Sequence, residues 1–158
     1  MPDCASDTGT GLETRTTTKT MAIGKALRQK VYQKCGGRCG YCGESIKENG
    51  FQVDHIISQR NFLTHIVNKW QVPDYLLHLT TDDVNHIDNL MPACRVCNNW
   101  KSTNPIEFFR SEIQDQIKRV NSYSSNYRMA KRYGLVEETP KPIVFYFETI
   151  TVNQPTND

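Results

Sequence analysis

Cys39-Gly-Tyr-Cys42 and Cys94-Arg-Val-Cys97 are two short cysteine motifs that decide how this 158-residue chain folds. In each motif two residues separate the thiols, the spacing at which both sulfurs can bind one tetrahedral metal ion. Two such pairs supply a closed Cys4 site, the arrangement typical of structural zinc. Closing the loop of roughly fifty residues between them costs on the order of 3–4 kcal/mol, whereas structural zinc returns about 10–16 kcal/mol. We therefore expect the four cysteines to bind Zn²⁺.

The chain has six cysteines, and the compartment decides whether such residues form disulfides or bind metal. The sequence shows no basic segment followed by an apolar run and no stretch of eighteen apolar residues. We therefore expect a cytoplasmic protein, intracellular and without a membrane partner, in which zinc binding is favoured over Cys39–Cys94 disulfides. Of the two remaining cysteines, Cys35 is expected to be a buried or free thiol and Cys4 a free thiol.

Composition divides the chain into a long central domain and two tails. Residues 1–21 are rich in Thr, Gly and Asp and have almost no apolar side chains, so we predict that they are disordered. Residues 22–151 form the predicted domain, and residues 152–158 a flexible C-terminal tail. A domain of this length has room for a modest hydrophobic core.

Apolar periodicity and turn residues predict an α+β fold for the domain. Strands are expected in three places: 51–56, 90–93 and 141–150, the last (KPIVFYFETI) with a β-branched and aromatic core. Helices are expected before the Gly36-Gly37 pair, directly after Cys94, and in two later stretches: 103–120 and 124–133. Two weak helical patterns lie on either side of Pro73.

Charge is unevenly distributed, although the formal net charge is only +2. Residues 24–47 and residues 94–132 each carry a net charge of +5, whereas residues 48–93 sum to −4 and the C-terminal end to −3. Basic blocks on either side of an acidic centre suit a polyanion such as DNA with a metal ion in the middle. Solvated helix faces produce similar blocks, so the charge pattern alone leaves both interpretations open.

Polar residues suited to hydrolytic chemistry follow each cysteine motif. Asp54 and His55 end the strand after the first motif, and Asn98 directly follows the second. On a helix the two cysteines of the second motif share a face, and Asn98 points about 100° further round, toward that strand. The zinc site therefore sets a carboxylate, an imidazole and a carboxamide near one another. Lys101 falls on the same side, where it could contact a phosphate.

The sequence resembles the HNH nuclease superfamily, and within it the small zinc-containing proteins common in bacteria and their phages. The matching stretches are CGYC, VDHII, DNLMPACRVCNNWKS and, less specifically, the tail from EFF to FETI, which together span about residues 22–150. The resemblance implies a ββα-metal fold, in which a β-hairpin and a helix clasp one divalent ion, here with flanking helices and the C-terminal strand. It also implies a metal-dependent endonuclease that hydrolyses DNA phosphodiester bonds.

Carried over to the matching positions, the resemblance implies a role for each candidate residue. His55 would be the general base that takes a proton from the attacking water, a task that its ordinary pKa of about 6.5 suits. Asp54 and Asn98 would bind the catalytic ion, which we expect to be Mg²⁺ or Mn²⁺ because oxygen ligands suit hard cations. Asn89 would hold the loop that carries His55 in position. Three basic residues are candidate contacts to DNA phosphates: Lys101, Arg95 and Arg60.

The segment 58–88 departs from the simpler members of the superfamily, which have a short glycine-rich loop between the His and the Asn of the motif. Here about thirty residues intervene. This insertion is either a recognition element or lid over the site, or a surface elaboration without a role in chemistry. We interpret its three histidines individually as ordinary polar residues rather than metal ligands: His65, His78 and His86.

Two other functions compete with the nuclease. A nucleic-acid-binding module would keep the zinc and the basic helices, but it has no need of Asp54, His55 and Asn98 together. A zinc deaminase carries a Pro-Cys-x-x-Cys signature. Here Ala93 interrupts that signature, no Glu lies two residues after His55, and the first cysteine motif would have no use. The nuclease is therefore the favoured hypothesis.

Overall fold

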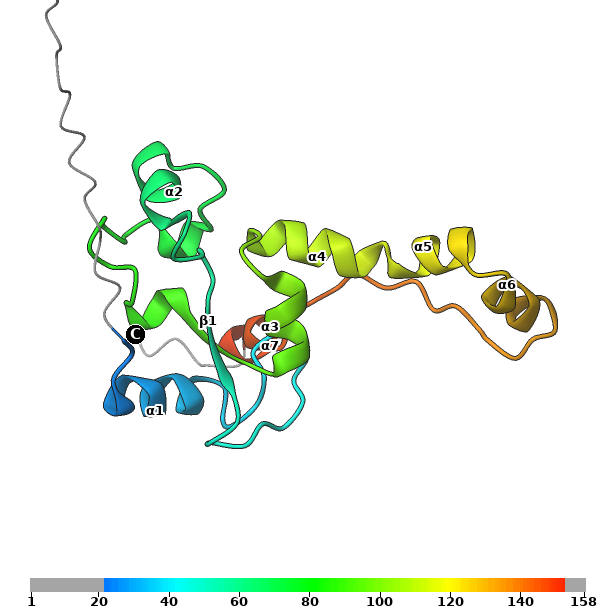
Figure 1. Cartoon of the computed structure of the whole chain (residues 1–158), viewed down its shortest axis with the longest axis horizontal. Coiled ribbons are helices and arrows are strands. Elements are labelled where there is room, and N and C mark those ends of the chain that lie inside the picture. Colours follow the sequence, from blue (N-terminus) through cyan, green and yellow to red (C-terminus); the bar gives the residue numbers. More distant parts are fainter. Residues whose placement is uncertain (1–21, 153–158) are drawn as a thin grey trace, which may run out of the picture.

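An antiparallel sheet of two strands organises the fold, which the computed structural model describes for residues 22–152 (Figure 1). β1 (Gln52–His55) pairs with β2 (Leu90–Ala93), and the register places His55 opposite Leu90. Both strands lie where the sequence predicts them. The pairing brings the segment after the first cysteine motif beside the segment before the second.

Two helices attach to this sheet next to the cysteine motifs. α1 (Lys25–Lys34) precedes the first motif, and its C-cap Cys35 is followed by Gly36 and Gly37, whose φ angles of 58° and 71° are ones that glycine adopts readily. α3 (Arg95–Lys101) begins directly after Cys94, whose thiol caps it by accepting a hydrogen bond from the N–H of Cys97. Both helices confirm the sequence prediction.

The insertion between the strands contains one helix and two 3-10 helices. α2 (Phe62–Asn68) and η1 (Asp74–Leu76) lie on either side of Pro73, as the two weak helical patterns predict. η2 (Ile87–Asn89) follows and leads directly into β2. The insertion is therefore folded, and it returns the chain to the sheet.

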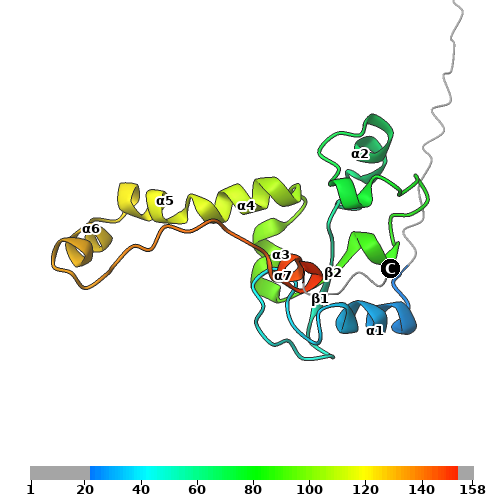
Figure 2. The ribbon, with the colours of Figure 1, turned by 180° about the vertical axis from the view of Figure 1, so that it is seen from behind.

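Three consecutive helices form an arm, residues 106–140, that projects from the rest of the molecule (Figures 1 and 2). They are α4 (Ile106–Gln114), α5 (Gln116–Tyr123) and α6 (Ser125–Arg132). The chain then runs back along the arm toward the sheet. Among the helices of residues 22–152, none combines the length and the apolar character that crossing a membrane requires.

The arm differs from the sequence prediction at one point. The helix expected over 103–120 is interrupted at Asp115, whose ψ of −1° departs from the helical value. The last helix of the arm ends as predicted, since Gly134 has a φ of 71°.

The predicted strand over 141–150 is wrong, because α7 (Tyr146–Val152) forms in its place. The N–H groups of Tyr146 and Phe147 donate to the carbonyls of Tyr41 and Gly40 at 3.0 and 2.8 Å. The first cysteine loop thus satisfies amides that the start of a helix leaves without partners. The helix extends to Val152, the first residue of the predicted C-terminal tail. The remainder of both predicted tails, with Cys4, lies outside the described residues.

Aromatic side chains join the first cysteine loop, the base of the arm and the start of α7. Tyr41 packs edge-on against Phe109 and Phe145 at centroid distances of 5.4 and 5.3 Å, and the two phenylalanines stack at 5.5 Å. All three residues are buried. Phe145, one of the aromatic residues on which the predicted strand is based, therefore packs in the core without forming a strand.

Replacing Phe145 by alanine tests this packing. Phe145 is 1% exposed and contacts both other rings, so Phe145→Ala should lower the free energy of unfolding by about 3–5 kcal/mol. Urea unfolding of both proteins measures the difference. Tyr123→Ala is the control: that side chain is 88% exposed, and its loss should cost less than about 0.5 kcal/mol. Equal costs for the two changes would contradict the proposed core.

Candidate functional site

Four cysteine sulfurs from the two motifs converge. The Sγ atoms of Cys39, Cys42, Cys94 and Cys97 all lie within 4.8 Å of one another, and those of Cys42 and Cys94 are 3.9 Å apart. Four thiolates at about 2.3 Å from a tetrahedral zinc ion lie about 3.8 Å from each other, so the spacing fits zinc. A disulfide needs about 2.0 Å, and all four residues are free thiols. The predicted cluster is confirmed, and it could hold a metal such as zinc.

Backbone hydrogen bonds shape the loops that carry this cluster. The N–H of Gly43 donates to the carbonyl of Cys39 at 2.9 Å, which closes the first loop, and Gly43 has a φ of 77°. The N–H of Gly40 donates to the carbonyl of Pro92 at 2.7 Å, which ties that loop to β2. Hydrogen bonding from the Cys97 thiol and from backbone amides lowers the pKa of Cys39, so a thiolate forms readily there.

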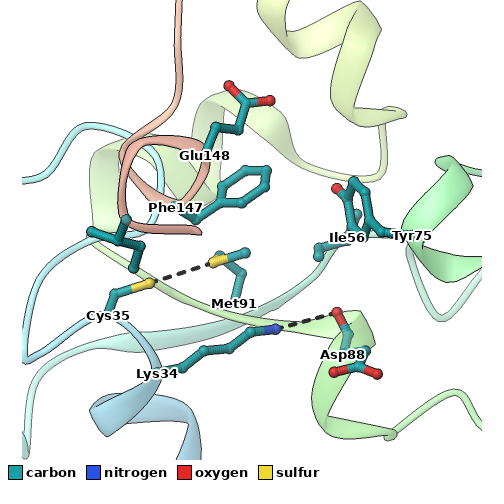
Figure 3. Close-up of a pocket in the computed structure, with 9 residues that line it drawn as sticks. Lys34, Cys35, Ile56, Tyr75, Asp88, Met91, Phe147 and Glu148 are labelled. Carbon is teal, nitrogen blue, oxygen red and sulfur yellow. Dashed lines mark hydrogen bonds between the residues drawn. The ribbon is translucent and has the colours of Figure 1, made fainter. Parts of the chain in front are cut away.

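Cys35 is close to the cluster in sequence but has a different environment. It is buried, and its sulfur lies 3.9 Å from the sulfur of Met91 (Figure 3). Burial raises the pKa of its thiol to about 11. Cys35 is therefore a protonated core residue, one of the two possibilities that the sequence left open.

A surface cavity of about 360 Å³ brings together four of the predicted site residues: Asp54, His55, Arg60 and Asn98. Asp54 and His55 come from the end of β1 and Asn98 from α3, the helix that begins at the second cysteine motif. A second cavity of about 420 Å³ shares His55 in its lining and extends to Arg28. The imidazole therefore lies where two hollows meet, with an arginine in the lining of each.

Lys101 is not the exposed phosphate contact that we expected. It is fully buried, with its Nζ atom 3.0 Å from Asp54 Oδ2 and donating to the carbonyl of His55 at 2.7 Å. The hydroxyl of Tyr41 donates to the same carboxylate oxygen. Burial raises the pKa of Asp54, and Lys101 and Tyr41 oppose that shift. The lysine points inward because this carboxylate needs a compensating cation.

His55 is held by residues of the insertion. Its Nε2 lies 2.9 Å from Asn85 Oδ1 and 3.2 Å from the amide nitrogen of Gln59. Burial lowers the pKa of His55, and the hydrogen bond to Asn85 opposes this effect. The imidazole is therefore more readily neutral than an exposed histidine, as a proton acceptor must be.

Asn89, the last residue of η2, is fully buried directly before β2 and binds the chain just beyond His55. Its Oδ1 accepts from the N–H of Ile57 at 2.8 Å, and its Nδ2 donates to the carbonyls of Ile57 and Val84 at 3.1 and 2.9 Å. It thus connects the insertion to the segment after β1. Arg95 is exposed on α3 and is not among the residues that line the two cavities at His55.

Four further residues of the site were missed by sequence reasoning: Tyr41, Ser58, Gln59 and Asn85. The Oγ of Ser58 lines the smaller cavity and is the one buried side-chain polar atom of the described residues without a hydrogen-bond partner. Ser58 and Gln59 directly follow the VDHII stretch, and that proximity could have indicated them. Asn85 lies thirty residues from His55, and no local pattern marks it.

Neither a protein-family model nor a curated protein nor a solved structure matches this chain. The α+β fold and the Cys4 cluster are shown by the structure itself. The resemblance to HNH nucleases depends on the motifs alone, and the chemistry has to be argued from the residues of the cavity.

Zinc content tests the cluster. Protein dialysed against chelator-free buffer should retain close to one zinc per chain, measured by elemental analysis. Cys39→Ser should lose that zinc and unfold, because metal binding supplies a large part of the folding free energy in such domains. Cys35→Ala removes a buried thiol outside the cluster and should keep one zinc. A folded, zinc-free protein with cysteines joined as disulfides would refute the assignment.

The buried ion pair gives a second test. Lys101→Met should lower the free energy of unfolding by about 3–5 kcal/mol, because it leaves the Asp54 carboxylate buried without its cation. Adding Asp54→Asn should recover most of that loss, since the uncompensated charge is then gone. Lys118→Met, at an exposed position on the arm, is the matched control and should have little effect. Additive losses in the double variant would show that the two residues do not interact.

Proposed function

We propose that this chain is an HNH-type endonuclease of the ββα-metal fold, which hydrolyses DNA phosphodiester bonds with the help of one divalent ion. The observation that carries the proposal is the cavity in which Asp54, His55 and Asn98 meet. Two of these side chains come from the end of β1 and one from the helix that begins at the Cys4 cluster. The closed thiol cluster suits a structural zinc, which leaves the oxygen donors of the cavity for a separate ion.

Asp54 and Asn98 are the residues that would hold Mg²⁺ or Mn²⁺. Lys101 and Tyr41 both contact the Oδ2 atom of the Asp54 carboxylate. Oδ1 is thus the oxygen that would face an ion. The raised pKa of this buried carboxylate also favours a cation beside it. When bound, the ion would neutralise charge on the phosphate.

His55 would act as the general base. In the tautomer in which Nε2 donates to Asn85 Oδ1, the lone pair lies on Nδ1, and that nitrogen can accept a proton from water. Asn85 sets the orientation of the ring, and Asn89 holds the segment that follows it. The contacts of these two asparagines support the role because a base must be positioned as well as unprotonated.

Three side chains would receive the DNA backbone. Arg60 and Arg28 line the two cavities that meet at His55, so positive charge lies in both directions from the base. Ser58 Oγ, which has no partner among the described residues, could donate to a phosphate oxygen in the smaller cavity. A polyanion lying across both hollows would place a phosphate near His55.

Substitution of the cavity residues tests the enzyme against the binding module. His55→Ala should reduce cleavage of supercoiled plasmid by about 10²–10⁴-fold, the contribution of a positioned general base, and leave zinc content and DNA affinity nearly unchanged. Asn98→Ala should weaken the site for the divalent ion instead. Raising the Mn²⁺ concentration should therefore partly restore cleavage by Asn98→Ala and not by His55→Ala, whereas added imidazole should restore some cleavage to His55→Ala alone.

Asn99→Ala is the matched control, because this neighbouring asparagine is exposed and does not line the cavity. It should cleave like the parent. Undiminished cleavage by His55→Ala would show that another group is the base. If the parent cleaves no DNA with any divalent ion tested, the binding module becomes the better explanation of the zinc and the basic residues.

A further inference from the structure

Three metal-ligating side chains of the insertion meet outside the cavity described above. They are His78, just after η1, His86, the N-cap of η2, and Asp88, within η2. His78 Nε2 lies 3.0 Å from Asp88 Oδ2, and His86 Nδ1 lies 3.5 Å from the same oxygen. One ligand atom from each residue lies within 4.8 Å of the others. The sequence alone leads us to interpret both histidines as ordinary polar residues rather than metal ligands.

The spacing and the chemistry of these atoms fit a metal ion. Zinc binds histidine nitrogen and carboxylate oxygen at about 2.0–2.2 Å, which puts tetrahedral ligands about 3.3–3.5 Å apart. Two imidazoles and a carboxylate suit Zn²⁺ or a similar first-row divalent ion better than Mg²⁺ or Ca²⁺. All three side chains are partly exposed, so an ion can reach them from solvent.

The surrounding structure holds the ligands in place. The N–H of Asp88 donates to His86 Nδ1 at 3.3 Å, which fixes the ring beside Asp88, and a metal ion bound to this nitrogen would replace that long hydrogen bond. Lys34 of α1 donates to the carbonyls of Ile87 and Leu90, both at 2.9 Å, and to that of Asp88 at 3.3 Å (Figure 3). These hydrogen bonds anchor the backbone of η2 to α1. They therefore fix the backbone position of Asp88.

We propose that His78, His86 and Asp88 form a further metal site, outside both the Cys4 cluster and the cavity at His55, for Zn²⁺ or a similar divalent ion. Three protein ligands leave a coordination position for water, so this site is open and exchanges its metal, unlike the closed Cys4 cluster. The ion joins the two ends of the loop 79–85. Because Asn85 in this loop contacts His55, metal binding restrains the partner of that imidazole.

Isothermal titration of protein that already carries one zinc per chain tests the proposal with ZnCl₂ as the probe. One further zinc per chain should bind. His78→Ala and Asp88→Asn should each weaken this second binding by about 100-fold or more, since even loss of an outer-shell partner costs 10–100-fold. Asp82→Asn, an exposed carboxylate of the same loop outside the cluster, should bind the second zinc like the parent.

Two further measurements make the result specific. Co²⁺ added to the zinc-loaded protein should give absorption of nitrogen and oxygen coordination without a thiolate charge-transfer band, which separates this site from the cysteines. Zinc should also slow amide hydrogen exchange over residues 79–85 in the parent and not in His78→Ala. The absence of a second zinc, or equal binding in the parent and both ligand variants, would overturn the proposal. Neither result depends on whether the protein cleaves DNA.

Discussion

The convergence of four thiols is the constraint on which the rest of this structure depends. One pair lies in the loop after α1 and the other at the start of α3, more than fifty residues later. Around this point the Gly40 amide binds the Pro92 carbonyl, and α7 places its first amides on the same loop. The core of a domain this small is modest, so a metal ion held by these four thiols would contribute more to stability here than in a large protein. The convergence of the four thiols therefore fixes the positions of both strands and of the cavity.

The Lys101–Asp54 pair links stability to the site. A buried ion pair by itself adds little stability, but removing one partner leaves a buried charge without compensation. Asp54 lies at the end of β1 beside His55, and Lys101 also binds the carbonyl of His55. The same lysine therefore compensates the charge of the carboxylate and holds the backbone of the next residue in place. A residue that looked like a surface contact in the sequence is an internal support for the cavity.

Much of this arrangement follows from local sequence signals. The cysteine spacing predicts the cluster. Short apolar runs bounded by turn residues predict β1 and β2, and apolar residues at helical spacing predict α1, because each signal lies within the element that it describes. The strand predicted for the C-terminal segment is wrong because β-branched and aromatic residues, which are favoured in strands, are equally favoured in any buried position. Hydrogen bonds to Tyr41 and Gly40 stabilise the start of α7 instead. The inward direction of Lys101 and the contact of Asn85 with His55 depend on tertiary packing, which no local pattern encodes.

The position of the insertion has a consequence for how this chain can change over evolutionary time. The segment 58–88 begins after β1 and ends before β2, so it lies wholly within the loop that the two cysteine motifs close. The entropic cost of closing a flexible loop rises only with the logarithm of the loop length, so doubling the length adds about 0.6 kcal/mol. Residues can therefore be gained or lost between the strands with little penalty, provided that both ends stay paired. The sheet and the thiols act as a fixed frame in which this part of the surface is free to diversify.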